Sequence, residues 1–310
     1  MTFDTSLLDE PDAVLLRQEN DAAILEALTY YTVPIMFFRA GADRENLLPQ
    51  DYEGNGSGVL FHLSGYHFIL SAGHCVEDYQ KQPCAFGVDN GPHCYAPPRW
   101  HSGYRYTGVG ERDFGYILIP EDQVGRFTSG NRVFLSRDRV EPLSSAETRT
   151  HNDWMILAGY PSAIQQKASN GLGARLLSYP TTLAGLGNAP ASKLNSPAQA
   201  VEYVDLWVPQ MGVQPASDYA EVEVPLLGGA SGGGCWRAGV RGRPSATPWT
   251  ADRMKLSGLH VSSPRKQMAH RFAREILVGH HLRLIAEELP AVKPAIFDRW
   301  PSLQDPIWAP

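Results

Sequence analysis

Three short segments of the chain carry residues that together could transfer an acyl group. They read Leu70-Ser71-Ala72-Gly73-His74-Cys75, then Arg112-Asp113-Phe114-Gly115, then Gly228-Gly229-Ala230-Ser231-Gly232-Gly233. Acyl transfer needs a nucleophile, a base that takes its proton, and an acid that fixes the tautomer of the base. Ser231, His74 and Asp113 could supply these groups, so the segments suggest attack of a serine on a carbonyl carbon.

Ser231 lies in a run of glycines. A serine hydroxyl is a weak nucleophile, and it needs both a base and a site that stabilises the oxyanion. Glycines lack a Cβ atom, so the backbone around Ser231 can turn tightly and approach a substrate. Taken alone, the segment is equally compatible with a glycine-rich turn that carries a solvated serine.

His74 and Asp113 both lie at the ends of apolar runs. His74 follows the run 68–70, and Asp113 opens the run 114–119. A carboxylate at the mouth of an apolar strand can be partly buried and can accept a hydrogen bond from an imidazole. The simpler alternatives are a histidine bonded to local backbone and an acid paired with Arg112.

Other acids and histidines offer weaker candidates. Asp78 and Asp89 precede no apolar run as strong as the one after Asp113. His260, in the apolar stretch Lys255–Ser262, is a competitor to His74 that could line a substrate cleft.

In these motifs and their order the chain resembles the trypsin/chymotrypsin-like serine peptidases, in particular the bacterial type. The resemblance covers about residues 30–289, and it is specific at the three motifs. It implies an all-β fold of two six-stranded antiparallel β-barrels. It also implies a catalytic triad of His74, Asp113 and Ser231, with an oxyanion hole formed by the amides of Gly229 and Ser231. The implied activity is that of a serine endopeptidase.

The sequence departs from the family pattern at two places. Ala230 precedes the nucleophile where vertebrate digestive members carry an aspartate, so activation by an ion pair to a new N-terminus is not available. Secreted relatives often bridge the cysteine beside the catalytic histidine to the preceding strand, but the strand 56–61 has no cysteine. A disulfide at Cys75 is therefore not expected, which favours a reducing compartment.

The resemblance also indicates where the substrate side chain would bind. The pocket floor would fall at Pro225, followed by Leu226, Leu227 and Gly228, and one wall at Val261, Ser262 and Ser263. None of these residues is a carboxylate, so selection for Lys or Arg is not supported. A small or medium apolar side chain is the expected preference.

The elements that must position these residues follow from hydrophobic patterns. Residues 11–29 and 267–289 have helical spacing, and the segments between them read as short strands joined by turns. We expect an N-terminal helical extension (1–29), a first barrel with His74 and Asp113 (30–130), a second barrel with Ser231 (131–264), and a C-terminal helix with a tail rich in Pro and Trp (265–310).

Composition excludes several other classes. The chain has 310 residues with 27 basic and 33 acidic side chains and a formal net charge of −6. This balance does not favour nucleic acid. No apolar run approaches the roughly 20 residues that cross a membrane, and no signal peptide is visible after Met1, so the expected location is the cytoplasm. The expected partners are a polypeptide substrate and a regulatory protein.

No metal or organic cofactor is expected. Four residues could be imagined as a metal cluster, but their spacing matches no tight ligand pair; they are Cys75, Cys84, His93 and Cys94.

Two other classes of function remain open. The first is a non-catalytic or latent binding module on the same fold, although pseudoenzymes usually lose one triad member. The second is an esterase-like hydrolase, because residues 229–233 match Gly-x-Ser-x-Gly. In that fold the acid and the histidine follow the serine, which leaves only Asp252 with His260 or His270.

Overall fold

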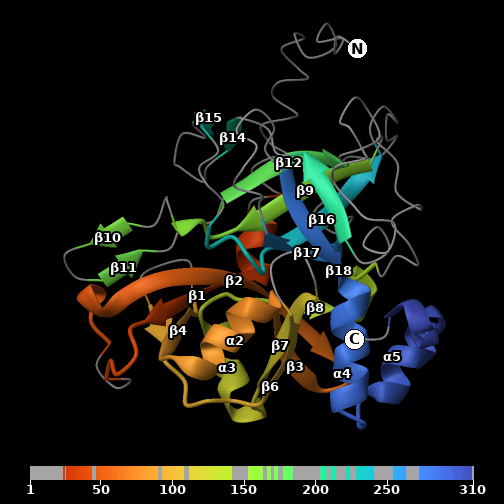
Figure 1. Cartoon of the computed structure of the whole chain (residues 1–310), viewed down its shortest axis with the longest axis horizontal. Helices are drawn as coiled ribbons and strands as arrows, with labels where there is room; N and C mark the ends of the chain where they lie inside the picture. The colour runs from red at the N-terminus through yellow and green to blue at the C-terminus, as the bar shows by residue number, and fades with distance from the viewer. Residues whose placement is uncertain are drawn as a thin grey trace, which may run out of the picture.

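The computed structural model describes most of the chain around the three motifs (Figure 1). The described residues are 24, 26–43, 47–89, 93–107, 112–141, 153–162, 166–168, 171–173, 177–183, 203–207, 211–213, 221–223, 228–240, 254–262 and 272–308. They form a mostly β structure with antiparallel sheets and a few helices. This confirms the β-rich character expected from the sequence.

The first sheet carries the histidine and the acid, and its strand order is β5-β4-β1-β2-β3-β7-β6, with β8 beside β2. All its neighbours are antiparallel except the β2–β8 pair. Its strands are β1 (Thr32–Phe38), β2 (Tyr52–Leu63), β3 (Tyr66–Ser71), β4 (Cys84–Gly87), β5 (Cys94–Tyr95), β6 (Ser102–Tyr106), β7 (Asp113–Ile119) and β8 (Leu135–Ser136).

The second sheet carries the serine, and its order is β13-β18-β17-β16-β9-β12-β14-β15, with a further pairing of β13 with β12. Its strands are β9 (Asp153–Gly159), β12 (Leu177–Leu183), β13 (Tyr203–Trp207), β14 (Met211–Val213), β15 (Glu221–Glu223), β16 (Gly234–Val240), β17 (Lys255–Ser262) and β18 (Phe272–Leu277). A separate pair joins β10 (Gln166–Ala168) and β11 (Gly171–Gly173). The described residues thus form eight strands in each main sheet. The expected two six-stranded barrels remain a prediction.

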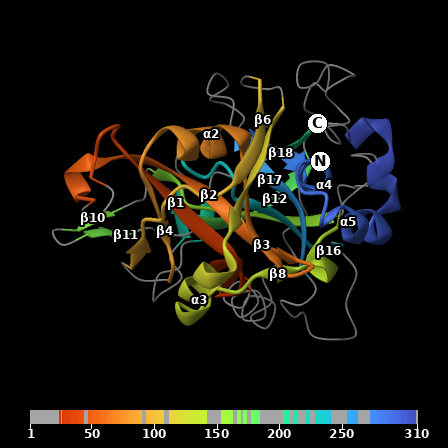
Figure 2. The same cartoon turned by 90° about the horizontal axis from the view of Figure 1, so that it is seen from below.

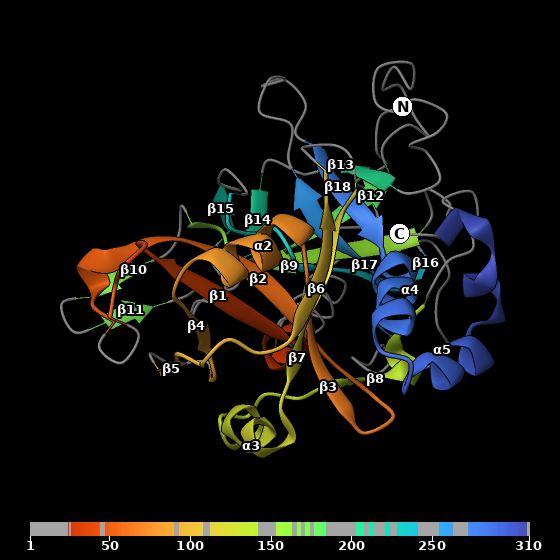
Figure 3. The same cartoon turned by 60° about the horizontal axis from the view of Figure 1, so that its bottom comes forward.

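Within the described part of the chain, helices α2 to α5 flank the sheets, together with short 3-10 turns. They are α2 (Gly73–Lys81), α3 (Glu121–Ser129), α4 (Val278–Glu288) and α5 (Lys293–Arg299). Figures 2 and 3 show α4 beside β6 and β7, with α5 on its outer side. None of the helices among the described residues combines the length and the apolar character needed to cross a membrane.

One buried core joins the two sheets. Phe61 and Phe68 of the first sheet belong to the same apolar cluster as Trp236 and Leu259 of the second. Burial of this cluster is the main term that holds the sheets together, at about 25 cal/mol for each Å² of apolar surface removed from water.

The prediction of a long C-terminal helix over residues 267–289 is wrong for residues 272–277, and residues 267–271 lie outside the described residues. Residues 272–277 form β18, which pairs with β13 on one side and β17 on the other. The helix begins only at Val278. Hydrogen bonds to two neighbouring strands outweigh the helical spacing of the apolar residues.

Helices α2 and α3 were not expected. The sequence analysis predicted short strands joined by turns between residues 29 and 267, whereas α2 and α3 lie within this range. The N-terminal helix expected over 11–29 falls mostly outside the described residues, although 24 and 26–31 are helical.

Candidate active site

Strand register places His74 next to Asp113. β3 and β7 are antiparallel, with Ser71 opposite Gly115. Gly73 comes two residues after Ser71, and Asp113 comes two residues before Gly115. If the same register is continued, Gly73 therefore lies level with Asp113. The end of one strand and the start of the other therefore meet at one edge of the sheet.

Gly73 allows this approach. A Cβ atom on Gly73 would overlap the carbonyl oxygen of Arg105 and lie 2.8 Å from the amide nitrogen of Phe114. Because Gly73 has no side chain, the first turn of α2 can pack directly against β6 and β7.

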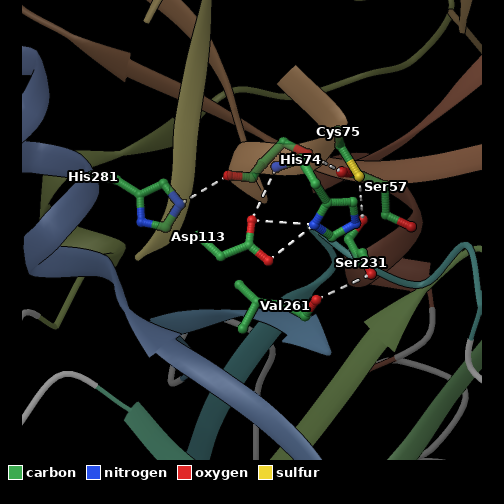
Figure 4. A network of polar contacts seen from close by, with 8 residues as sticks. Ser57, His74, Cys75, Asp113, Ser231, Val261 and His281 are labelled. Atoms are coloured by element: carbon green, nitrogen blue, oxygen red, sulfur yellow. Dashed lines mark hydrogen bonds and ion pairs between the residues drawn. The ribbon is translucent and has the colours of Figure 1, made fainter. Parts of the chain in front are cut away.

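Asp113 receives three contacts from His74 (Figure 4). The backbone amide of His74 donates to Oδ1 at 2.9 Å, and ring Nδ1 lies 3.1 Å from Oδ1 and 2.9 Å from Oδ2. The Asp113 side chain is 6% exposed and the His74 side chain 31%. With Nδ1 donating to the carboxylate, Nε2 is left to accept a proton.

The pair favours the protonated imidazole. Burial by itself lowers the pKa of His74, but Cys75 and the Asp113 carboxylate raise it, and the net pKa lies above the usual 6.5. A buried carboxylate favours the charged form of a histidine that it accepts from. Asp113 can therefore both orient the ring and stabilise the imidazolium formed during proton transfer.

Ser231 stands on a tight turn directly before β16. Its hydroxyl lies 3.4 Å from the carbonyl oxygen of Val261, to which it donates. Between the described residues no hydrogen bond joins Ser231 to His74, although Figure 4 shows the two side chains close together. A hydroxyl changes acceptor by rotation about one bond, so this position is compatible with transfer of the proton to His74.

Glycines on both sides of Ser231 have positive φ. Gly229 has φ of 90° and Gly232 has φ of 85°. A Cβ atom on Gly232 would overlap Ser57 O and Ser71 Oγ, and one on Gly229 would lie 2.7 Å from the amide nitrogen of Ser162. Both positions therefore require glycine for backbone angle and for space.

The backbone amides of residues 228 to 231 have no acceptor within the described part of the chain. They include the amides of Gly229 and Ser231, the two that the sequence analysis assigned to the oxyanion hole. The neighbouring amide of Gly232 is occupied, because it donates to His260 O at 2.6 Å. Unpaired amides in a turn beside a nucleophile are the kind of donor that stabilises an oxyanion.

Strand β2 contributes residues that the sequence analysis did not single out. The amide of Ser57 donates to Ser231 O at 2.7 Å, and its hydroxyl donates to Gly229 O at 3.0 Å. Asn55 contacts the same turn through Gly229 O at 3.5 Å. The segment Gly56-Ser57-Gly58 could have indicated this contact in the sequence, because glycines inside a strand often mark the close approach of another backbone.

The remaining predicted site residues fall in several places. Val261 is buried and accepts from Ser231, and Gly228 is exposed with its carbonyl bonded to Ser162. Ser262 ends β17. The other pocket residues lie outside the described residues, and they are Pro225, Leu226, Leu227 and Ser263.

Of the alternative candidates, His260 is 1% exposed, and its backbone bonds Gly232 and Gly233 at 2.6 and 2.8 Å. Asp89 pairs with His93. Among the described acids, Asp113 is the one hydrogen-bonded to His74.

Two histidines of α4 pack behind Asp113. The rings of His280 and His281 lie 5.5 and 5.8 Å from the ring of Phe114, and His281 Nε2 contacts Ser71 O at 3.0 Å. Burial lowers the pKa of His280 to about 3 and that of His281 to about 4. Both are therefore neutral packing groups at ordinary pH.

The cysteines form no cross-link. No disulfide bridges any two of Cys75, Cys84, Cys94 and Cys235. In the described residues, no group of three or more His, Cys, Asp or Glu side chains is placed to hold a metal ion.

Comparisons with known proteins give similarity to solved structures but not to a family model or a curated protein. No family model matches the chain, and no curated protein matches it. A solved structure of a thermostable serine protease from an extremophilic microorganism has 11% sequence identity and a TM-score of 0.42. The match covers 81% of this chain and 92% of that one. Function is therefore inferred from the residues of the site themselves.

Proposed function

We propose that this protein is a serine endopeptidase that works through His74, Asp113 and Ser231. The observation that carries the proposal is the carboxylate of Asp113 bonded to both the amide and ring Nδ1 of His74. In neutral His74 this bond leaves Nε2 as the nitrogen that can accept a proton, and Ser231 lies beside the ring on a glycine turn.

The proposed reaction proceeds in two halves. Ser231 Oγ attacks the peptide carbonyl carbon while His74 Nε2 takes the hydroxyl proton, and the amides of Gly229 and Ser231 bind the oxyanion. The C–N bond then breaks as His74 returns the proton to the leaving amine, which leaves an ester on Ser231. Water attacks this ester with His74 again as the base, and Ser231 leaves with the proton.

Substrate selection follows from the residues around the turn. The proposed pocket, with Pro225, Leu226 and Leu227 before Gly228, contains no carboxylate, so we propose a preference for small or medium apolar side chains at P1. Cleavage of a peptide library would check this, and a profile dominated by Arg at P1 would contradict it.

A second candidate function is a latent module with the same triad. It is favoured by one observation, the bond of Ser231 Oγ to Val261 O in place of His74. In that case a partner or a cleavage elsewhere would have to redirect the hydroxyl, because Ala230 offers no carboxylate for an activating ion pair.

Labelling with a fluorophosphonate probe separates the two candidates. We expect the purified protein to be labelled at Ser231, and labelling to be lost in Ser231→Ala and in His74→Ala. If the unmodified protein stays unlabelled while the folded variants match it, a constitutive hydrolase is excluded and the latent module is favoured.

A further inference from the structure

The turn that carries Ser231 is held through the carbonyls of three successive residues. Gly228 O accepts from the amide of Ser162 at 2.6 Å, Gly229 O from Ser57 Oγ at 3.0 Å, and Ala230 O from the amide of Gly233 at 2.8 Å. In a trans peptide the C=O and N–H groups point in opposite directions, and no cis peptide bond is present among the described residues. Fixing the oxygens of Gly228 and Ala230 therefore also aims the amides of Gly229 and Ser231.

The turn holds Ala230 O through its own Gly233 amide, but it could not hold the Gly228–Gly229 and Gly229–Ala230 peptides by itself. Glycines at 228, 229, 232 and 233 allow each peptide to rotate at low cost, and Gly229 already has φ of 90°. A rotated Gly228–Gly229 peptide would present a carbonyl oxygen where the oxyanion must bind. Catalysis at this site therefore needs anchors outside the turn.

Ser57 is the first anchor. It is fully buried on β2, and its hydroxyl donates to Gly229 O. Ser57 Oγ also accepts a hydrogen bond from the amide of Tyr160 at 2.9 Å. Its own amide donates to Ser231 O at 2.7 Å. One residue of the first sheet thus contacts the turn of the second sheet at two points.

Asn55 is the second anchor. Its Oδ1 accepts from Ser162 Oγ at 2.7 Å, and its Nδ2 donates to Tyr160 O and, at 3.5 Å, to Gly229 O. The hydroxyl of Tyr52 also donates to Oδ1, at 2.7 Å. Asn55 therefore fixes Ser162, whose amide in turn holds Gly228 O.

We propose that Asn55 and Ser57 are positioning residues that set the orientation of the Gly228–Gly229 and Gly229–Ala230 peptides. Asn55, through Ser162, keeps the amide of Gly229 directed at the reacting carbonyl oxygen, and Ser57 fixes the Gly229–Ala230 peptide that follows it. Both act through the turn without touching the substrate. This inference rests on the proposed function, because it assigns a role within the same site.

The test compares Asn55→Ala and Ser57→Ala with a matched control, Ser257→Ala. Ser257 is also buried and donates to a carbonyl, Cys235 O at 2.8 Å, and this carbonyl lies outside the turn 228–233. The probes are p-nitrophenyl acetate for kcat and KM and a fluorophosphonate for the rate of labelling at Ser231. Unfolding free energies are measured for all variants.

The proposal predicts that both variants lose kcat roughly tenfold to hundredfold with KM little changed, the size of effect that a small misplacement at a reacting centre causes. Ser257→Ala keeps kcat although it loses a comparable hydrogen bond. Ser57→Thr, which retains a hydroxyl, recovers activity relative to Ser57→Ala. Asn55 is only partly buried, so its variant tests the idea independently of tight packing at Ser57.

Two results would overturn the positioning role and leave the proposed function standing. One is kcat in both variants equal to that of Ser257→Ala, and the other is a rise in KM with kcat unchanged. If the unmodified protein neither hydrolyses the ester nor labels at Ser231, the proposed function fails and the positioning role fails with it.

Discussion

The carboxylate of Asp113 binds His74 through both its backbone amide and its ring, at 2.9 Å in each case. One acid therefore fixes the start of α2 and the orientation of the imidazole together. The ring cannot shift away from the acid unless the first turn of the helix also moves. This double contact makes Asp113 and His74 a single rigid unit that faces Ser231.

Replacing the acid should remove most of the activity. In Asp113→Asn the side chain can still accept from the amide of His74, but its NH2 group no longer fixes the ring tautomer with Nδ1 as the donor. We expect kcat to fall by about 10³–10⁴-fold, as in hydrolases of this type. Asp78→Asn on α2 is the control, and equal losses in both variants would contradict the assignment.

The labelling rate should depend on pH through His74. A general base must be neutral, and the pKa of His74 is raised above 6.5. The rate of fluorophosphonate labelling should therefore rise with pH, with its midpoint above that of an ordinary histidine. Asp113→Asn should move the midpoint down, because it removes one cause of the shift; an unchanged midpoint would argue against His74 as the base.

The contributions of His74 and His281 to the free energy of unfolding should change in opposite directions as the pH rises. The raised pKa of His74 means that its contribution is complete below about 6.5 and is lost as pH rises through the folded-state value. The lowered pKa of His281 means that its contribution is complete above about 6.5 and is lost as pH falls toward about 4.

Urea unfolding measured at several pH values tests these two opposite pH dependences. The stability difference between the unmodified protein and His74→Ala should shrink with rising pH. The difference between the unmodified protein and His281→Ala should shrink with falling pH. Parallel changes in the two series would show that one of the shifts has been assigned the wrong sign.

Gly232→Ala should damage the turn that carries Ser231. Its φ is 85°, and a Cβ atom would overlap Ser57 O and Ser71 Oγ. Strain alone should cost about 1–3 kcal/mol, and labelling at Ser231 should be lost. Gly125→Ala is the control, because Gly125 lies on α3 with open space around it, and alanine there should be neutral or stabilising by about 0.5–1 kcal/mol. Equal stability of the two variants would be inconsistent with the described turn.

Gly56→Cys should form a disulfide with Cys75. A Cβ atom on Gly56 would lie 3.3 Å from Cys75 Cβ, a few tenths of an ångström short of the usual separation in a disulfide. Under oxidising conditions we expect a mass loss of about 2 Da and a gain of about 3 kcal/mol in unfolding free energy, both reversed by reductant. Gly56→Ser is the control; an oxidised sample that retains two thiols would contradict the geometry.

The sequence predicted the residues that meet at the site better than the elements that carry them. His74 and Asp113 could be paired because both flank apolar strands, and antiparallel pairing brings such ends together. The α2 and α3 helices could not be anticipated in the same way. Their apolar positions are few, and their placement depends on packing against strands that the local sequence does not reveal.

Residues 272–277 show a second reason why the sequence alone does not predict the fold. Their apolar spacing fits a helix, and only the partners β13 and β17 decide for a strand. Ser57 and Asn55 show a third reason, because their bonds to Gly229 span more than 170 residues of chain. A pattern within a short stretch of sequence cannot predict contacts between residues so far apart in the chain.

The chain passes from β18 directly into α4, so a truncation before β18 removes both elements. β18 completes the sheet of the nucleophile, and α4, which begins at the next residue, covers Phe114 beside the acid. Residues 272–288 therefore contribute to both sheets at once. A fragment ending before residue 272 would lose a strand from one half and the cover of the other. The two halves are consequently not exchangeable modules, and only a chain that retains residues 272–288 can assemble the site.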